Sequence, residues 1–381
     1  MQLRVSLVLS LLLSAAVAED SVSIHYLYYD EDSGRTTVKT PSLQISKDFG
    51  LDYSVDFSYS YDTLSGASPT FYDAASGASA KAPEGVVYSD AVRYDNVPYS
   101  DNRRAYGLQL TRRMPQSRDE LNIGLNYSKE RDYIAKEVTI SFMHYLDSYK
   151  NSSLTYGFAY QHNTPKVACS FNPKECDSVS GASGVVNKRM ESYQISFGYS
   201  QIIDSKSEYK LSLFGIFENG YLSNPYMKVV RDNNGFSAQI VPENKPPTRN
   251  AIGVDVEYKK AWQNDMFTKL YYRFYHDDWD IDSHTVNIEM TKDMQKFSYG
   301  GGVRWYRQSR AFFYSGTKDY FTNQIYASSD RRMDSFASSG FYLCLRYRQN
   351  DKIEWSVDGG WYNQPKFYHS SYFGIGVKYR Y

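Results

Sequence analysis

The sequence has little cysteine, no net charge and no catalytic motif. Three cysteines stand among 381 residues, and 43 basic side chains balance 43 acidic ones. A chain with no net charge lacks the excess of basic residues that nucleic-acid-binding proteins use to bind phosphates. The six histidines are scattered, with neither a Gly-x-Ser-x-Gly elbow nor a His-Glu-x-x-His pair. We therefore expect no nucleic-acid partner, no enzyme activity, and no bound cofactor or metal.

Two weaker alternatives concern one acidic segment. His276 stands beside two aspartates, a pairing that a barrel enzyme could carry at its rim. Asp278, Asp280 and Asp282 also repeat at the spacing of a calcium loop, with Glu289 in the last ligand position. At the sixth position, where such a loop needs a glycine, this sequence has Ser283. The flanking segments look like strands, whereas a calcium loop of this kind is flanked by helices. A solvated acidic hairpin tip is the simpler interpretation.

The first residues have the pattern of a signal peptide. Arg4 supplies the positive end, Val5 to Leu13 is mostly apolar, and Ala16-Val17-Ala18 is a small-x-small cleavage site. The apolar run is shorter than the ~20 residues that a membrane-spanning helix needs, and no later segment meets that length. We expect a signal peptide over 1–18 and a single mature domain over 19–381.

Aromatic residues are abundant in a chain that is otherwise polar. The sequence holds 38 tyrosines and 20 phenylalanines, although charged residues make up 23% of it. An ordinary soluble core does not need this combination. A membrane β-barrel does, because a wet lumen requires polar side chains and each membrane interface takes a girdle of aromatics.

Alternation of apolar and polar residues recurs along the mature chain. In Leu51 to Asp62 every odd position is apolar or aromatic and every even position is polar. Because successive strand side chains point to opposite faces, this predicts one apolar and one polar face. One strand of a soluble sheet can show the same pattern, so the number of such strands is what distinguishes a membrane barrel from a soluble sheet. Sixteen are predicted: 21–29, 37–49, 51–62, 103–114, 119–131, 134–146, 153–163, 189–201, 207–219, 249–261, 265–276, 284–292, 295–308, 335–348, 352–362 and 367–381.

The predicted connections alternate between short and long. Tight ones rich in turn formers follow every second strand, and the long ones are 63–102, 164–188, 220–249 and 309–334. Short periplasmic turns with longer outer loops are typical of outer-membrane barrels, and an even strand count brings both termini to the periplasm. The loop 63–102 is either a flexible surface loop or a plug folded into the lumen.

The closing stretch and three internal motifs resemble a known family. An aromatic last residue, Tyr381, on an alternating strand resembles the C-terminal signal that the insertion machinery of Gram-negative outer-membrane barrels recognises. With the runs Tyr28-Tyr29-Asp30-Glu31, Lys39-Thr40-Pro41-Ser42-Leu43 and Arg103-Arg104-Ala105-Tyr106-Gly107, the chain resembles the Gram-negative outer-membrane family catalogued as domain of unknown function 3570. The resemblance covers nearly all of the mature chain. It implies a barrel with no established activity, and a link to periplasmic redox or flavin-attachment proteins.

Cys169 and Cys176 lie seven positions apart in a predicted loop. In an oxidising compartment a disulfide is favoured over two free thiols or a metal pair. Cys344 remains, and its parity places it inside the barrel as an isolated residue.

Strand parity also predicts which charges face the lumen: Asp52, Asp56, Arg304, Arg346, Arg348, Glu354, Asp358, Lys378 and Arg380. Two interpretations stand side by side. Walls of opposite sign could set up a transverse field that orients a polar solute. Alternatively, neighbouring charges pair across strands and stabilise or plug the lumen.

The sequence therefore predicts an all-β, sixteen-stranded antiparallel outer-membrane barrel. A porin-like channel for small polar solutes is the first functional hypothesis, because sixteen strands generally enclose water. A plugged barrel that serves a periplasmic redox or flavin system as an outer-membrane partner is the alternative. The expected surroundings are outer-membrane lipid, lipopolysaccharide and the barrel-insertion machinery.

Overall fold

A computed structural model describes residues 20–73, 86–87, 92–169, 172, 176, 184–232, 238–316, 324–365 and 367–381. Residues 1–18, predicted to be a signal peptide, lie outside these ranges. Sixteen strands form the wall: β1 (Ser21–Glu31), β2 (Thr36–Phe49), β3 (Tyr53–Asp73), β5 (Val92–Arg113), β6 (Glu120–Lys129), β7 (Tyr133–Tyr145), β8 (Ser152–Ala168), β10 (Met190–Asp204), β11 (Ser207–Gly220), β14 (Thr248–Ala261), β15 (Met266–Asp277), β16 (Asp282–Asp293), β17 (Phe297–Gln308), β18 (Phe336–Arg348), β19 (Ile353–Gln364) and β20 (Tyr368–Arg380).

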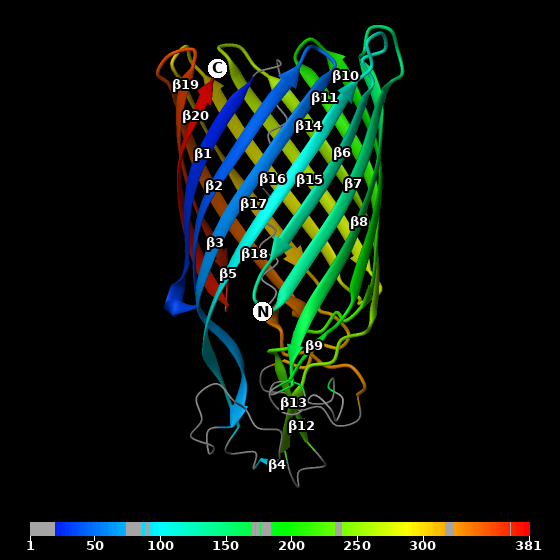
Figure 1. The fold of residues 1–381 in the computed structure, drawn as a ribbon, viewed down its shortest axis with the longest axis vertical. Coiled ribbons are helices and arrows are strands. Elements are labelled where there is room, and N and C mark those ends of the chain that lie inside the picture. The colour runs from blue at the N-terminus through cyan, green and yellow to red at the C-terminus, as the bar shows by residue number, and fades with distance from the viewer. Residues whose placement is uncertain are drawn as a thin grey trace.

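The strands form a closed antiparallel barrel (Figure 1). Each wall strand pairs with the next along the chain, and β1 pairs with β20 from Ser21↔Arg380 to Glu31↔Ser370. Closure leaves no free edge around the barrel itself, so within the wall each strand is paired on both sides. The predicted fold class and strand number are confirmed. No helix in the described part of the chain is long and apolar enough to cross a membrane.

The outer wall carries the apolar set that alternation predicts. Leu125, Ile252 and Leu343 point outward and are 47%, 60% and 65% exposed. A continuous apolar band of this kind would cause aggregation in water, whereas in a bilayer it faces hydrocarbon. The alternation therefore separates a lipid-facing surface from a polar lumen.

The long connections all lie at one end of the barrel, as predicted, and the connections at the other end are all tight. The C-terminus and the tight turns share one end, where Tyr381 N donates to Asp20 O at 3.1 Å, and the long loops gather at the other (Figure 1). We call these the terminal end and the loop end. The loop end also carries β9 (Val185–Asn187), paired with β8, and a small sheet of β4 (Val86–Val87), β12 (Lys228–Asp232) and β13 (Ala238–Pro242).

The segment 63–102 differs from both interpretations made for it. It begins and ends as a two-stranded extension of β3 and β5, paired from Thr63↔Asn102 to Asp73↔Val92. This extension projects away from the barrel mouth (Figure 1). The paired part is therefore neither an unstructured loop nor a lumen plug, because the two arms satisfy each other's backbone groups. Residues 74–85 and 88–91 lie outside the described ranges.

Candidate functional site

The lumen is the candidate site, and its two halves have different chemistry. From β2 to β10 the inward positions carry mostly small neutral polar side chains, with hydrogen bonds such as Thr111 Oγ1 to Asn122 Oδ1 at 2.6 Å. Such a surface hydrates readily, and charges among it form pairs, as Arg103 does with Asp62 and Arg113 does with Glu120. It includes Ser42, Gln44, Ser58, Ser60, Gln109, Asn122, Asn126, Thr155, Gln161, Gln194 and Ser196.

From β11 to β20 the inward positions carry charged residues and tyrosines instead. Most of these charges pair with a neighbouring strand: Arg273 Nε lies 2.6 Å from Asp255 Oδ1, and Lys269 Nζ lies 2.8 Å from Glu289 Oε2. Pairing offsets the cost of placing charges beside a low-dielectric wall. This half therefore combines many ionised groups with little net local charge.

Two of the predicted lumen acids pair across strands, Glu354 with a predicted lumen base and Asp358 with a histidine outside the predicted set. Arg380 Nη2 donates to Glu354 Oε2 at 2.8 Å, and His25 Nε2 lies 3.0 Å from Asp358 Oδ1. His25 reaches Asp358 because β1 closes the barrel beside β20. The pairing interpretation thus holds for these two acids.

The predicted lumen bases differ in their surroundings. Arg346 is exposed, and Arg348 Nη1 donates to the carbonyl of Gln295, in a turn at the terminal end, at 3.4 Å. Arg304 is also exposed and lies 5.8 Å from the Tyr306 ring centroid. Lys378 stands opposite Glu354 in the strand register. The described contacts thus leave Arg304 and Arg346 free to act on a solute or ion.

The two acids predicted to face the lumen from an N-terminal strand, Asp52 and Asp56, differ in position. Asp56 faces the lumen and accepts a hydrogen bond from Ser46 Oγ at 2.6 Å. The prediction for Asp52 is wrong: it lies in the turn between β2 and β3 and pairs with Arg118 at 3.0 Å. Strand parity does not extend into a turn, so it could not place this side chain. Of the two acids predicted to make one side of the lumen negative, only Asp56 therefore faces the lumen.

Several inward side chains are exposed well within the wall strands. Gln109 on β5 and Gln194 on β10 are exposed, as is Arg346 on β18 across the barrel. An inward side chain can be exposed only where the lumen has room for water. The barrel interior is therefore not filled by its own side chains at these positions.

Loops pack into a structured cap at the loop end. Trp279, Ile281, Ala311 and Phe313 form one buried apolar cluster. Near it, Lys245 Nζ lies 3.1 Å from Glu243 Oε1 and 3.4 Å from Asp330 Oδ2, all with buried side chains. Burial disfavours the charged form of Asp330, but the nearby cations of Arg332 and Lys245 outweigh this effect and lower the pKa of Asp330. A buried, paired charge network of this kind holds the loops in one arrangement.

Three carboxylates meet at the loop end of β5 and the β6–β7 turn, where motif analysis gave no signal. The oxygens of Asp101, Glu130 and Asp132 lie within 4.8 Å of one another. Burial raises the pKa of Glu130 to about 7; Arg103 opposes this, and Asp132 and Asp101 add to it. Oxygen ligands suit Ca²⁺ or Mg²⁺. Their sequence spacing matches no motif because the strand pairing brings them together.

The acidic segment near His276 does not form the calcium loop considered for it, although His276 does have a carboxylate partner. The backbone N–H and side-chain amide of Asn250 donate hydrogen bonds to the Asp278 carboxylate. Glu289 lies within β16 and pairs with Lys269. The carboxylates therefore do not converge as a calcium loop requires. His276 Nδ1 lies 2.8 Å from Asp282 Oδ1 on the outward face.

The cysteines occupy two settings. Cys169 and Cys176 form a disulfide, the pairing that their spacing favoured. Cys344 lies on the inward face of β18 and is half-buried.

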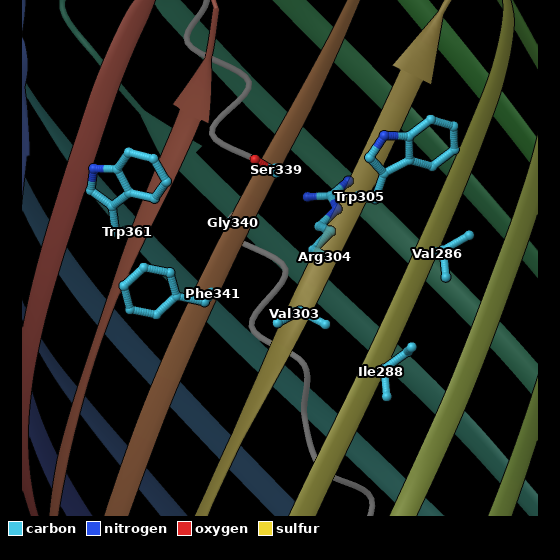
Figure 2. Close-up of a pocket in the computed structure, with 9 residues that line it drawn as sticks. All are labelled: Val286, Ile288, Val303, Arg304, Trp305, Ser339, Gly340, Phe341 and Trp361. Carbon is cyan, nitrogen blue, oxygen red and sulfur yellow. The ribbon is translucent and has the colours of Figure 1, made fainter.

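A hollow on the outer wall adds an apolar feature. Figure 2 shows it across β16 to β19, with Trp305, Phe341 and Trp361 spread around Gly340. Its volume is about 340 Å³. Since its large side chains belong to the outward set, it is a groove facing lipid and not an entrance to the lumen.

Comparisons with known proteins agree with this architecture. The profile of a family described as "Protein of unknown function (DUF3570)" matches residues 6–374. No curated protein matches in sequence. Among solved structures, CdiB from Acinetobacter baumannii is similar, with a TM-score of 0.53 at 8% identity over 95% of this chain and 60% of that one. A variant of the ferric enterobactin receptor PfeA from Pseudomonas aeruginosa has a TM-score of 0.46 at 9% identity, over 92% and 54%. A bacterial polysaccharide outer membrane secretin gives 0.48 at 8%, over 96% and 99%. The chain spans less than two thirds of the CdiB and PfeA chains.

Proposed function

The chain belongs to the family described as proteins of unknown function, DUF3570, and because that description carries no activity, we propose a function from the lumen itself. The protein is a porin-like channel of the Gram-negative outer membrane that lets small polar solutes diffuse through its barrel. The exposed inward side chains of Gln109, Gln194 and Arg346 carry this proposal. They line a hydrated interior, and the paired charges around them predict weak selectivity.

The location follows from the barrel and the chain ends. A cleaved signal peptide exports the chain, and the insertion machinery recognises the final strand together with Tyr381, which follows it. The outer wall then contacts outer-membrane lipid and lipopolysaccharide. Asp20, the first described residue, and Tyr381 both lie at the terminal end, so that end faces the periplasm and the loop end faces outward.

A barrel that conducts nothing is the second candidate, and the cap supports it. The cluster around Trp279 and the ion pairs of Lys245 give the loops a fixed packing at the outer mouth. A closed barrel of this kind would act through a partner, and the family resemblance suggests a periplasmic redox or flavin protein.

Single-channel recording in planar bilayers tests the two candidates. We expect stepwise current from refolded 19–381 once its heat-modifiable gel migration shows a folded barrel. Gln194→Trp should lower the conductance because a bulky ring enters the lumen. Ile195→Trp is the matched control, since Ile195 faces outward and is 51% exposed. Silence from folded protein would reject the channel and favour the closed barrel.

A further inference from the structure

Four cations lie on the outward face of neighbouring strands near the loop end of the barrel, three of them on the consecutive strands β5, β6 and β7. Lys39 on β2, Arg104 on β5, Lys129 on β6 and Lys136 on β7 are all exposed. They share strand parity with apolar residues that face lipid, such as Leu110 and Leu125. We call these four residues the outer cation arc.

The strand register places like charges side by side within this arc. Arg104 stands directly opposite Lys129. Lys129 pairs with Ile134, so Lys136, two residues further along β7, is its diagonal neighbour. Like charges directly opposite each other on one face destabilise a sheet. An arrangement that carries this cost suits an anion supplied from outside the chain.

The protein itself supplies no such anion in the part of these strands whose side chains are described. The outward positions of β2, β3, β5, β6 and β7 carry neither aspartate nor glutamate there. Asp30, on the outward face of the adjoining β1, is diagonal to Lys39 and stands on the far side of β2 from the other three members of the arc. The nearby carboxylate of Asp101 has the opposite parity and faces the lumen side, and Glu130, in the β6–β7 turn, lies within 4.8 Å of it. Among described residues, no ion pair involves a member of the outer cation arc.

Tyrosines next to the arc set its depth in the membrane. The rings of Tyr59 and Tyr106 lie 5.1 Å apart, those of Tyr106 and Tyr127 lie 6.4 Å apart, and Arg104 stands 5.9 Å from the Tyr61 ring centroid. Aromatic girdles mark the boundary between hydrocarbon and headgroups. The arc therefore sits at headgroup level, with the apolar band directly beneath it.

We propose that the outer cation arc binds the phosphate groups of a phosphorylated glycolipid of the outer leaflet, the lipid A class. Arginine and lysine bind phosphate through charge-assisted hydrogen bonds, and basic surfaces at the membrane interface bind anionic headgroups. The acyl chains of the same molecule lie along the leucine and tyrosine face below. This inference rests on the membrane orientation proposed above, but not on conductance.

A second basic hollow on the outer wall is a weaker candidate. Arg307 and Arg310 line it together with Asp282. Arg310 already pairs with Asp334 at 3.0 Å, so an internal carboxylate neutralises one of its two cations. Among the described residues, Arg104, Lys129 and Lys136 of the outer cation arc pair with no carboxylate.

Lipid binding to refolded, lipid-free 19–381 in detergent tests the proposal. Diphosphoryl lipid A is titrated and counted by native mass spectrometry, with monophosphoryl lipid A, zwitterionic phosphatidylethanolamine and inorganic phosphate as separate probes. We expect diphosphoryl lipid A to bind at least tenfold more tightly than phosphatidylethanolamine, with monophosphoryl lipid A in between. Affinity should fall as salt is raised. Full competition by millimolar inorganic phosphate would overturn the proposal, because the site would then recognise a free anion.

Variants assign the binding to the arc. Arg104→Gln/Lys129→Gln/Lys136→Gln should weaken binding of diphosphoryl lipid A at least tenfold, and each single variant should weaken it less. Arg112→Gln is the matched control, because Arg112 lies on the same face of β5 and stands 5.9 Å from the Tyr53 ring, but near the terminal end. Equal binding by wild type and the triple variant would reject the site. A barrel that binds lipid A yet conducts no current would reject the channel and leave this site standing.

Discussion

Glu354 and Arg380 form an ion pair between β19 and β20, with Arg380 Nη2 2.8 Å from Glu354 Oε2. Each side chain is only 17% exposed, although both lie inside a barrel that holds water elsewhere. Arg380 itself lies at the β20–β1 seam, where it is opposite Ser21. A partly buried pair at this place ties the last strand to its neighbour.

Replacing one partner of this pair should destabilise the barrel. We expect Glu354→Gln to lower the free energy of unfolding by about 1–2 kcal/mol, between the values for exposed and buried pairs. Urea unfolding followed by heat-modifiable migration measures it. Glu208→Gln is the control, because its pair with Lys259 is 47% and 45% exposed and should contribute less. Equal losses in the two variants would show that burial of the Glu354 pair has no effect.

Reversing an exposed lumen charge should change ion selectivity. Arg346 faces inward and is exposed, so Arg346→Glu changes the local charge by two units with little repacking. We expect the reversal potential in a salt gradient to shift toward cation preference. Arg346→Lys keeps the charge and should leave the potential unchanged. An unchanged potential in both variants would place Arg346 away from the ion path.

Removing the buried lysine of the cap should loosen the loops. Lys245→Met leaves Glu243 and Asp330 without a shared cation, and losing one partner of a buried network costs about 3–5 kcal/mol. Limited proteolysis should then cut the cap while the barrel stays heat-modifiable. Arg310→Gln is the control, since that arginine is 54% exposed. A protease-resistant Lys245→Met cap would mean that its apolar cluster suffices.

Glu130 should make the β6–β7 turn sensitive to pH. Burial raises its pKa from 4.5 to about 7, so the folded turn favours the protonated acid. This contribution to stability is complete below pH 4.5 and is lost as pH rises through about 7. Amide protection in the turn, corrected for intrinsic exchange, should fall by roughly tenfold or more across that range. Glu130→Gln should abolish the fall; if the variant retains it, another group is responsible.

Strand positions and faces could be predicted because they depend on local geometry. Side chains alternate with a period of two along any strand, so Val55 and Asp56 face opposite sides whatever their neighbours are. The same pattern at sixteen places, with loops sorted by length, predicted the barrel. The prediction failed at Asp52, where the strand had ended, and in the segment 63–102, where two arms pair with each other and need no apolar face.

The sequence by itself determined the strands, the lipid-facing and lumen-facing sets, and the end at which the loops lie. Only the tertiary structure decided which residues meet. Closure brings His25 beside Asp358, 333 positions away, and register sets Arg104 opposite Lys129. The loops contribute Glu243, Lys245 and Asp330 to one buried network. Alternation specifies a side of the wall, whereas contact between strands depends on register and closure, which no local pattern encodes.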